Sequence, residues 1–305
     1  MATVNPIDLY ELRYNNQSQD GEDGIIEKLI ELEGIDKGFF CEFGAWDGRY
    51  LSNCYNLIKK GWSGCFIEGD SLRYKNLLKN VPQSEIIKIN AWVTAAGENS
   101  LDNLLQRHKV SYVDLLSIDI DGDDLLVWKG VKKFVPKIVI VEYNPTIPSD
   151  VLYVNPPGCN HGNSMLAVLD YARSAGYSLI EGTDTNLMFV RSESRTVELI
   201  EKKNLADIAQ QTKHKRYFFA YDGTLLVHTR LSGPRVLEIL LVPWSYPPVI
   251  FPQPIPKMLR GYAPNKTKGL SRFFFSILTT VLLRPIAFFR TISVYLKAYR
   301  NRGKV

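Results

Sequence analysis

The fold of this chain can be worked out from residues 39–53, FFCEFGAWDGRYLSN. An apolar run that begins at Phe39 ends in an acid, Glu42, and a turn with Gly44 and Gly48 follows it. A second acid, Asp47, lies inside the turn. A turn that only reverses the chain needs glycine, asparagine or proline and no acid at the tip of a buried strand. A turn that holds a small polar ligand does need one, because a carboxylate accepts hydrogen bonds from amines and hydroxyls.

Strand-like and helix-like segments alternate around this turn. The apolar patterns predict strands at residues 39–43, 64–68, 85–89, 113–118 and 137–141, and helices at 24–32, 53–60, 72–79, 101–108 and 125–131. Continuous Val, Ile and Leu strands are typical of a parallel sheet that is covered on both faces. Asn163 or Ser164 can cap a further helix at 165–175, and an antiparallel strand pair is expected at 177–181 and 186–191. We therefore expect an α/β fold, a doubly wound Rossmann-like sheet with C-terminal antiparallel strands.

Charge is unevenly distributed over the 305 residues. Of the 37 Lys and Arg residues, eleven lie in residues 257–305, which contain no acid and leave 26 basic against 32 acidic residues elsewhere. An acidic body with a basic tail indicates a membrane surface or a nucleic acid as the partner of the tail. We predict four parts: a catalytic domain at 1–192, a small accessory segment of helix plus hairpin at 193–242, a Pro-rich and basic linker at 243–268, and an amphipathic tail at 269–305.

The cysteines indicate a reducing compartment. Cys41, Cys54, Cys65 and Cys159 are scattered without metal-type spacing, and no segment typical of a signal peptide opens the chain. Reduced thiols in the cytosol are the expectation.

Polar side chains follow four of the predicted parallel strands. They are Glu42, Glu68, Asp119 with Asp121, and Glu142 with Asn144. Ligands of such sheets bind outside the carboxyl ends of the strands, so we expect these side chains to line one site. A dinucleotide fingerprint would need glycine at position 46, where Trp46 stands. An acidic pocket suits a cationic ligand without phosphate, and S-adenosylmethionine is one.

Five motifs together resemble a known family. SQDGEDG (18–24), EFGAWDG (42–48), FIEGD (66–70), DLLSIDIDGDD (114–124) and VEYNP (141–145) are similar to those of the FkbM-type S-adenosylmethionine-dependent methyltransferases. The resemblance covers residues 13–192 and implies a class I methyltransferase fold and O-methylation of a sugar or similar hydroxyl. It places Glu42, Gly44 and Asp47 at the methionine end of the cofactor, Glu68 at the ribose, and Asn90 with Ala91 near the adenine. The neighbours that complete this implied cofactor-binding set are Ala45, Gly48, Asn53, Gly69 and Asp119.

The strand-end oxygens also suit a metal ion. Asp119 and Asp121 are two residues apart and face the same way in extended backbone, as do Glu142 and Asn144. This all-oxygen set fits Mg²⁺ or Mn²⁺, and a similar set serves catechol-type O-methyltransferases. The alternative is that Asp119 and Asp121 only orient backbone and substrate. His161 follows in a loop and is a candidate general base, or only a loop histidine beside a helix start.

The tail pattern predicts an interfacial helix. Its uninterrupted apolar run, 273–283, is shorter than the ~20 residues that span a bilayer. Beyond Pro285, cations share one side of a helix and aromatic or aliphatic residues share the other. We favour an anionic membrane surface as the partner of 269–305. The alternative is a packing helix of an oligomer, and nucleic acid is not expected because the run is too apolar.

These observations predict an O-methyltransferase that is cytoplasmic and peripherally attached to the inner face of a membrane. Its acceptor is expected to be a hydroxyl of a sugar or glycan. A lipid-linked glycan is one form that the acceptor can take, since a membrane-held enzyme suits a membrane-held acceptor. Two alternatives stay open: a metal-dependent hydroxylase-like relative on the same fold, and a membrane-anchored binding protein with a degenerate cofactor site.

Overall fold

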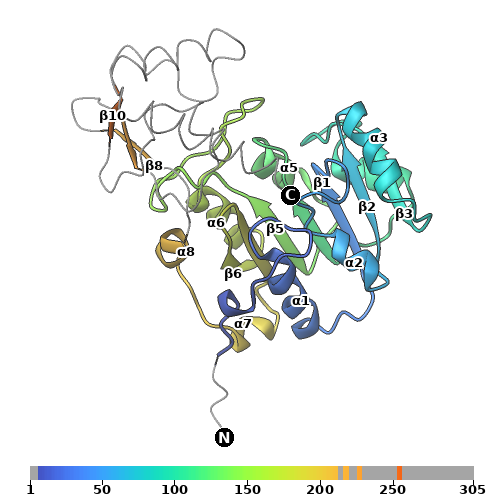
Figure 1. Ribbon diagram of the computed structural model, residues 1–305, viewed down its shortest axis with the longest axis horizontal. Coiled ribbons are helices and arrows are strands. Elements are labelled where there is room, and N and C mark those ends of the chain that lie inside the picture. The colour runs from blue at the N-terminus through green and yellow to red at the C-terminus, as the bar shows by residue number, and fades with distance from the viewer. Residues whose placement is uncertain (1–5, 212–215, 220–224, 229–252, 256–305) are drawn as a thin grey trace, which may run out of the picture. The chain divides into compact units, whose positions relative to one another are not determined.

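The computed structural model describes residues 6–211, 216–219, 225–228 and 253–255 (Figure 1). The chain folds into two compact units. The first contains residues 1–144 and 149–212, and the second contains 145–148 and 213–305.

The first unit is built on a seven-stranded sheet with the order β3-β2-β1-β4-β5-β7-β6. The strands are β1 Phe39–Phe43, β2 Ser63–Glu68, β3 Ile86–Asn90, β4 Leu115–Ile118, β5 Ile138–Glu142, β6 Tyr177–Gly182 and β7 Asn186–Arg191. The first five run parallel, whereas β7 lies antiparallel between β5 and β6. The predicted parallel sheet with a closing antiparallel pair is confirmed.

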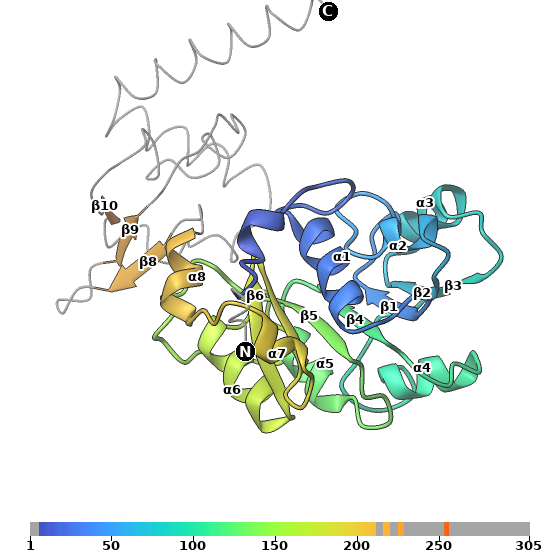
Figure 2. The ribbon, with the colours of Figure 1, turned by 90° about the horizontal axis from the view of Figure 1, so that it is seen from below.

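Helices cover both faces of this sheet (Figure 2). The helices on one face are α1 Glu22–Leu32, α2 Tyr55–Lys59 and α3 Ser71–Asn80. Those on the other are α4 Leu101–Arg107, α5 Asp124–Gly130 and α6 Met165–Ser174. A short 3-10 helix, η1 Tyr10–Leu12, precedes α1. The side chain of Ser164 accepts a hydrogen bond from the Ala167 amide, which makes it the cap of α6 that the sequence predicted as one of two candidates.

The alternation of side chains along β1 explains the two cores. Phe40 points into the core under α1 to α3, where its ring lies 5.1 Å from that of Phe66. Cys41 and Phe43 point into the opposite core, under α4 to α6. Strand side chains alternate between faces, so a continuous apolar strand fills both cores at once. Because the other side chains of such a strand are buried in the two cores, a ligand is contacted by residues at the end of the strand.

The segment after β7 differs from its prediction. The pattern at 197–211 predicts one helix, but two short helices form, α7 Thr196–Leu199 and α8 Leu205–Gln211. Between them Ile200 is extended and forms a parallel bridge with Ile7. Ile200 and Ile208 are both buried. The first compact unit extends to residue 212, and these two side chains belong to its two cores.

The second unit contains a three-stranded antiparallel sheet with the order β10-β9-β8. Its strands are β8 Arg216–Phe219, β9 Leu225–His228 and β10 Gln253–Ile255. The pairing of β8 with β9 confirms the predicted hairpin. β10 falls inside the segment expected to be a proline-rich linker. The predicted tail, 269–305, lies outside the described residues, and within the described part no helix has the length and apolarity to cross a membrane.

Candidate functional site

A cavity of about 440 Å³ opens at the carboxyl ends of the parallel strands. Glu42 and Glu68, at the tips of β1 and β2, line it together with Asp119 after β4 and Glu142 at the end of β5. The sequence predicted that these four acids would meet, because parallel strands end at one edge of their sheet. Asp121 and Asp123 join them, so six carboxylates line the cavity among the residues that the structure describes.

The turn after β1 brings β1 and β4 close together. Gly44 has φ 78°, and a Cβ atom there would lie 1.5 Å from the carbonyl oxygen of Asp119. Its amide donates to the carbonyl of Ile67 on β2. Glycine is therefore required at this position for both its conformation and its lack of a side chain. The close approach holds the backbone of Asp119 at the cavity wall.

Trp46 occupies the position where a dinucleotide fingerprint has glycine. It adopts φ 51°, and its amide donates to Oε2 of Glu68 at 2.8 Å. The indole lies at the cavity mouth, 44% exposed. The tryptophan thus holds Glu68 through its backbone and leaves its ring available at the rim.

Glu68 is fixed from two sides. Its Oε2 accepts from the Trp46 amide, and its Oε1 accepts from the Asp70 amide at 2.7 Å. Each carboxylate oxygen has a second lone pair, so the group can still accept hydrogen bonds from a ligand's hydroxyls. This geometry fits the ribose contact that the family resemblance implies for Glu68.

Glu42 is buried, and local hydrogen-bond donors stabilise its carboxylate. Its Oε2 accepts from the Ser52 hydroxyl at 2.9 Å and from the Cys54 amide at 2.8 Å. Burial nevertheless raises the pKa of Glu42 to about 7, against the effect of those hydrogen bonds. Asn53, also in the cavity wall, donates to the Ser117 hydroxyl.

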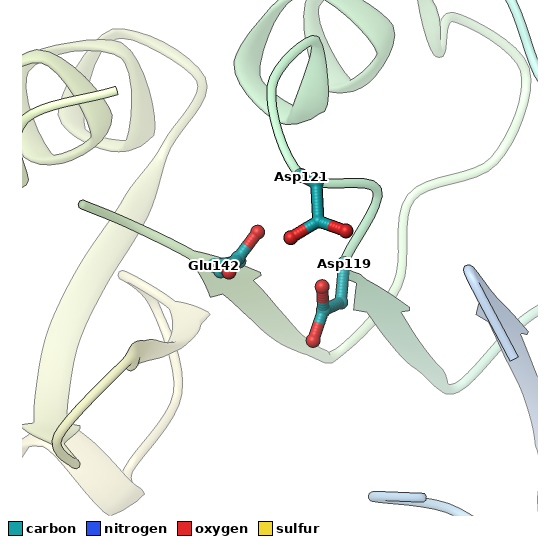
Figure 3. A group of neighbouring side chains, drawn as sticks. All are labelled: Asp119, Asp121 and Glu142. Atoms are coloured by element: carbon teal, nitrogen blue, oxygen red, sulfur yellow. The ribbon is translucent and has the colours of Figure 1, made fainter. Parts of the chain in front are cut away.

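Asp119, Asp121 and Glu142 meet at the ends of β4 and β5 (Figure 3). One oxygen from each lies within 4.8 Å of the others. Burial, followed by the charges of Asp124 and Asp121, raises the pKa of Asp119 to about 7. Burial and the neighbouring Asp119 also raise the pKa of Glu142 well above its ordinary value. Like charges at such distances retain protons unless a cation is bound among them.

Asp124 shapes the loop that carries Asp119 and Asp121. Its carboxylate accepts from the amides of Ile120, at 2.7 Å, and Gly122, at 2.9 Å. Asp121 takes φ 58° within this loop. The side chain of Asp124 is buried, and it acts as a support for the loop rather than as a wall of the cavity.

The loop after β5 forms another wall, but the predicted His161 is not part of it. Cys159 and Asn160 line the cavity, whereas Nδ1 of His161 lies 2.9 Å from the Tyr153 hydroxyl. Asn144 is also absent from the cavity wall, and its side-chain NH₂ group donates to the His161 carbonyl. Both residues therefore contribute hydrogen bonds to this loop, and neither lines the cavity.

Three residues implied as cofactor contacts make contacts within the fold and lie outside the cavity wall. Asp47 accepts from the amides of Arg49 and Tyr50 and so stabilises the turn. Gly48 packs against α3, where a Cβ atom would lie 2.2 Å from Leu77. The Asn90 side chain donates to the carbonyls of Glu68 and Gly69. None of the three lines the cavity, while Gly44, Ala45, Gly69 and Ala91 do.

The sequence did not point to several residues that do line the cavity. Among them are Gln19, Tyr50, Arg73 and Trp92. Trp92 is 69% exposed, and its ring covers Gly69, where an added Cβ atom would lie 2.3 Å from the indole. Its place directly after the predicted adenine contact Ala91 was the one signal that could have indicated it.

The comparisons with known proteins agree with the motif resemblance. Residues 94–179 match the Methyltransferase FkbM domain, a stretch that includes Asp119, Asp121 and Glu142. The predicted resemblance to S-adenosylmethionine-dependent methyltransferases is confirmed there. A search of curated proteins found no match.

Two solved structures are similar to this chain at low scores. One is an S-adenosylmethionine-dependent methyltransferase from Aquifex aeolicus, which is 13% identical with a TM-score of 0.34, over 54% of this chain and 87% of that chain. The other is an S-adenosylmethionine-dependent methyltransferase from Clostridium acetobutylicum, 9% identical with a TM-score of 0.38, over 61% and 92%. The α/β fold is shown by the chain's own seven-stranded sheet, with its strand order and its antiparallel β7.

Proposed function

We propose that this protein transfers the methyl group of S-adenosylmethionine to a hydroxyl group, and that the acceptor is a glycan. The observation that carries the proposal is the charge of the cavity. Six carboxylates and a single cation, Arg73, are found among the described residues that line it. A sulfonium cofactor that also carries an ammonium group fits such a site.

The residues present fit this cofactor from end to end. Glu68, held by two backbone amides, is placed to accept from the ribose hydroxyls. Ala91 and the exposed ring of Trp92 line the same end and suit the flat adenine. Glu42 and Asn53 line the other end, where a carboxylate and an amide can accept from the ammonium group. When bound, the cofactor supplies an electrophilic methyl group.

The acidic trio is the proposed acceptor site. With a pKa of about 7, Asp119 can accept a proton from a hydroxyl near neutral pH. His161 is not proposed for this step, because it lies outside the cavity wall beside Tyr153. Mg²⁺ or Mn²⁺ would be held by Asp119, Asp121 and Glu142, and an ion there lowers the pKa of a bound hydroxyl.

We further propose that the protein works at the inner face of an anionic membrane on a lipid-linked glycan. This part rests on the sequence of the tail, with eleven cations and no acid after residue 256. A membrane-held enzyme gains most from an acceptor held in the same membrane. Full activity of a tail-less protein on a freely soluble acceptor would contradict this part.

Calorimetric titration of the full chain with S-adenosylmethionine tests the cofactor assignment. Glu68→Gln should weaken binding by roughly 10-fold or more, because hydrogen bonds to charged groups contribute ~1.5–3 kcal/mol. The matched control is Glu98→Gln, since Glu98 is an exposed acid paired with Arg107 away from the cavity. Thermal unfolding of both variants checks that the turn survives.

Three outcomes separate the alternatives. Failure of the wild-type protein to bind the cofactor, with or without Mg²⁺, would contradict the methyltransferase proposal. Binding without methyl transfer to any hydroxyl acceptor would favour the degenerate binding protein. A requirement for metal and an oxidant, with the cofactor's methyl group left in place, would favour the hydroxylase-like relative.

A further inference from the structure

The mouth of the cavity contains one cation that the sulfonium and ammonium groups of the proposed cofactor do not explain. Arg73, in the first turn of α3, is the single cation among the described residues that line the cavity. The Cζ atom of its guanidinium lies 3.9 Å from the centroid of the Trp46 ring. A cation at the rim of an acidic cavity does not help to bind a sulfonium, so its presence needs a different explanation.

Both members of this stacked pair are held in place. The Asp70 side chain caps α3 by accepting from the amides of Leu72 and Arg73. Trp46 is fixed by the hydrogen bond that its backbone amide donates to Glu68 and by an edge contact with Tyr50, whose ring centroid lies 5.9 Å away. The guanidinium therefore projects from one anchored element and rests on another. Little conformational freedom remains to be lost when a ligand binds.

The donors of Arg73 remain available. Within the described part of the chain, its side chain makes no ion pair and no hydrogen bond, although six carboxylates line the same cavity. Stacking uses the face of a guanidinium and leaves the N–H donors in its plane free. Such a fork matches the two oxygens of a carboxylate or a phosphate.

We propose that Arg73, supported by Trp46, binds an oxyanion of a ligand that occupies the cavity, a phosphate or a carboxylate. The proposal deepens the proposed function and rests on it for the identity of the ligand. Two ligands could carry the group. The acceptor brings it if the glycan is phosphorylated, linked through phosphate or acidic, and the cofactor brings it through its own carboxylate.

Two titrations distinguish these sources in the full-length protein. The first compares S-adenosylmethionine with its decarboxylated analogue. The second adds inorganic pyrophosphate, without divalent metal, to the protein both with and without saturating S-adenosylhomocysteine. The variants are Arg73→Ala and Arg73→Lys. The lysine variant keeps the positive charge but lacks the paired N–H donors of a guanidinium. The control is Lys75→Ala, because Lys75 is an exposed cation of α3 that lies outside the cavity wall. The cap of α3 uses backbone amides, so these substitutions leave it intact.

Each result has a defined meaning. If the acceptor carries the oxyanion, Arg73→Ala weakens pyrophosphate binding by roughly 10-fold or more, Arg73→Lys weakens it less, and cofactor affinity is unchanged. If the cofactor carries it, Arg73→Ala weakens S-adenosylmethionine but not the decarboxylated analogue. Unchanged affinity in both titrations, or the same loss in Lys75→Ala, would overturn the proposal. Wild-type protein that binds pyrophosphate through Arg73 but no cofactor would overturn the proposed function alone.

Discussion

At the scale of single residues, Glu42 is a cavity-lining group whose protonation we expect to be linked to cofactor binding. It is buried at the tip of β1, and burial raises its pKa to about 7 from the ordinary value of 4.5. As the pH rises above 4.5, the unfolded chain loses this proton first and the folded chain keeps it until about pH 7. The free energy of unfolding therefore falls across this window, by on the order of 3 kcal/mol from this group. A cation bound nearby would offset the cost of the buried charge.

The corresponding prediction concerns the pH dependence of cofactor affinity. A bound cation favours the charged form of Glu42, so affinity for S-adenosylmethionine should rise up to pH of about 7 and then level off. In Glu42→Gln the profile should be flatter below neutral pH, and the loss of stability between pH 4.5 and 7 should be smaller. Calorimetry and urea unfolding at several pH values measure the two effects. Identical profiles for both proteins would show that Glu42 does not face the cofactor.

Residues at strand tips were predictable, while residues in turns and helices were less so. Glu42, Glu68, Asp119 and Glu142 reach the cavity because the end of a parallel strand is fixed by the sheet. Asp47 does not, because side-chain direction inside a turn depends on which amides it caps. Arg73 was not predictable either, since its direction is set by the ring of Trp46 on a different element.

At the scale of elements, the turn between β1 and α2 positions the loop after β4. The carbonyl of Asp119 fits against Gly44 only because no side chain is there. The strands themselves were predicted closely, because each fills two cores and carries an unbroken apolar signal. The helix expected at 197–211 was not, because the parallel bridge between Ile7 and Ile200 joins distant parts of the sequence and interrupts it.

Two alanine substitutions isolate this close approach. Gly44 and Gly34 both have positive φ, 78° and 63°, but an added Cβ atom at Gly34 meets nothing within 4 Å. Gly34→Ala should cost only the conformational strain of ~1–2 kcal/mol. Gly44→Ala should cost that plus the displacement of Asp119, roughly 3 kcal/mol or more in total, and should impair cofactor binding. Urea unfolding measures the free energy of unfolding of both variants. Equal decreases would mean that the backbone at Asp119 can move away from the turn without a cost in stability.

At the scale of the whole molecule, the residues that line the cavity and the residues of the basic tail belong to different compact units. The first contains the sheet, both cores and all of the described residues that line the cavity. α7 and α8 belong to it, since Ile200, Leu205 and Ile208 are buried. The basic tail is part of the second unit and lies outside the described residues. Cofactor binding and membrane attachment should therefore be separable.

A chain that ends at residue 212 tests this separation. It keeps the whole first unit, with residues 145–148 retained as a connection, so it should bind S-adenosylmethionine as tightly as the full chain does. It lacks the eleven cations beyond residue 256 and should no longer float with vesicles that contain anionic lipid, as the full chain is expected to do. Vesicles of neutral lipid are the control for both proteins.

The position of the truncation is itself part of the prediction. A chain that ends at residue 192 removes the side chains of Ile200 and Ile208, which lie buried in the two different cores. Their loss exposes apolar surface on both faces of the sheet, and each buried side chain of this kind contributes ~1.5–3 kcal/mol. The shorter chain should therefore unfold at lower urea concentration and lose cofactor affinity with its fold. Equal stability of the two truncated chains would support the domain end predicted near residue 192. Weak cofactor binding by the longer chain would mean that the second unit contributes to the site.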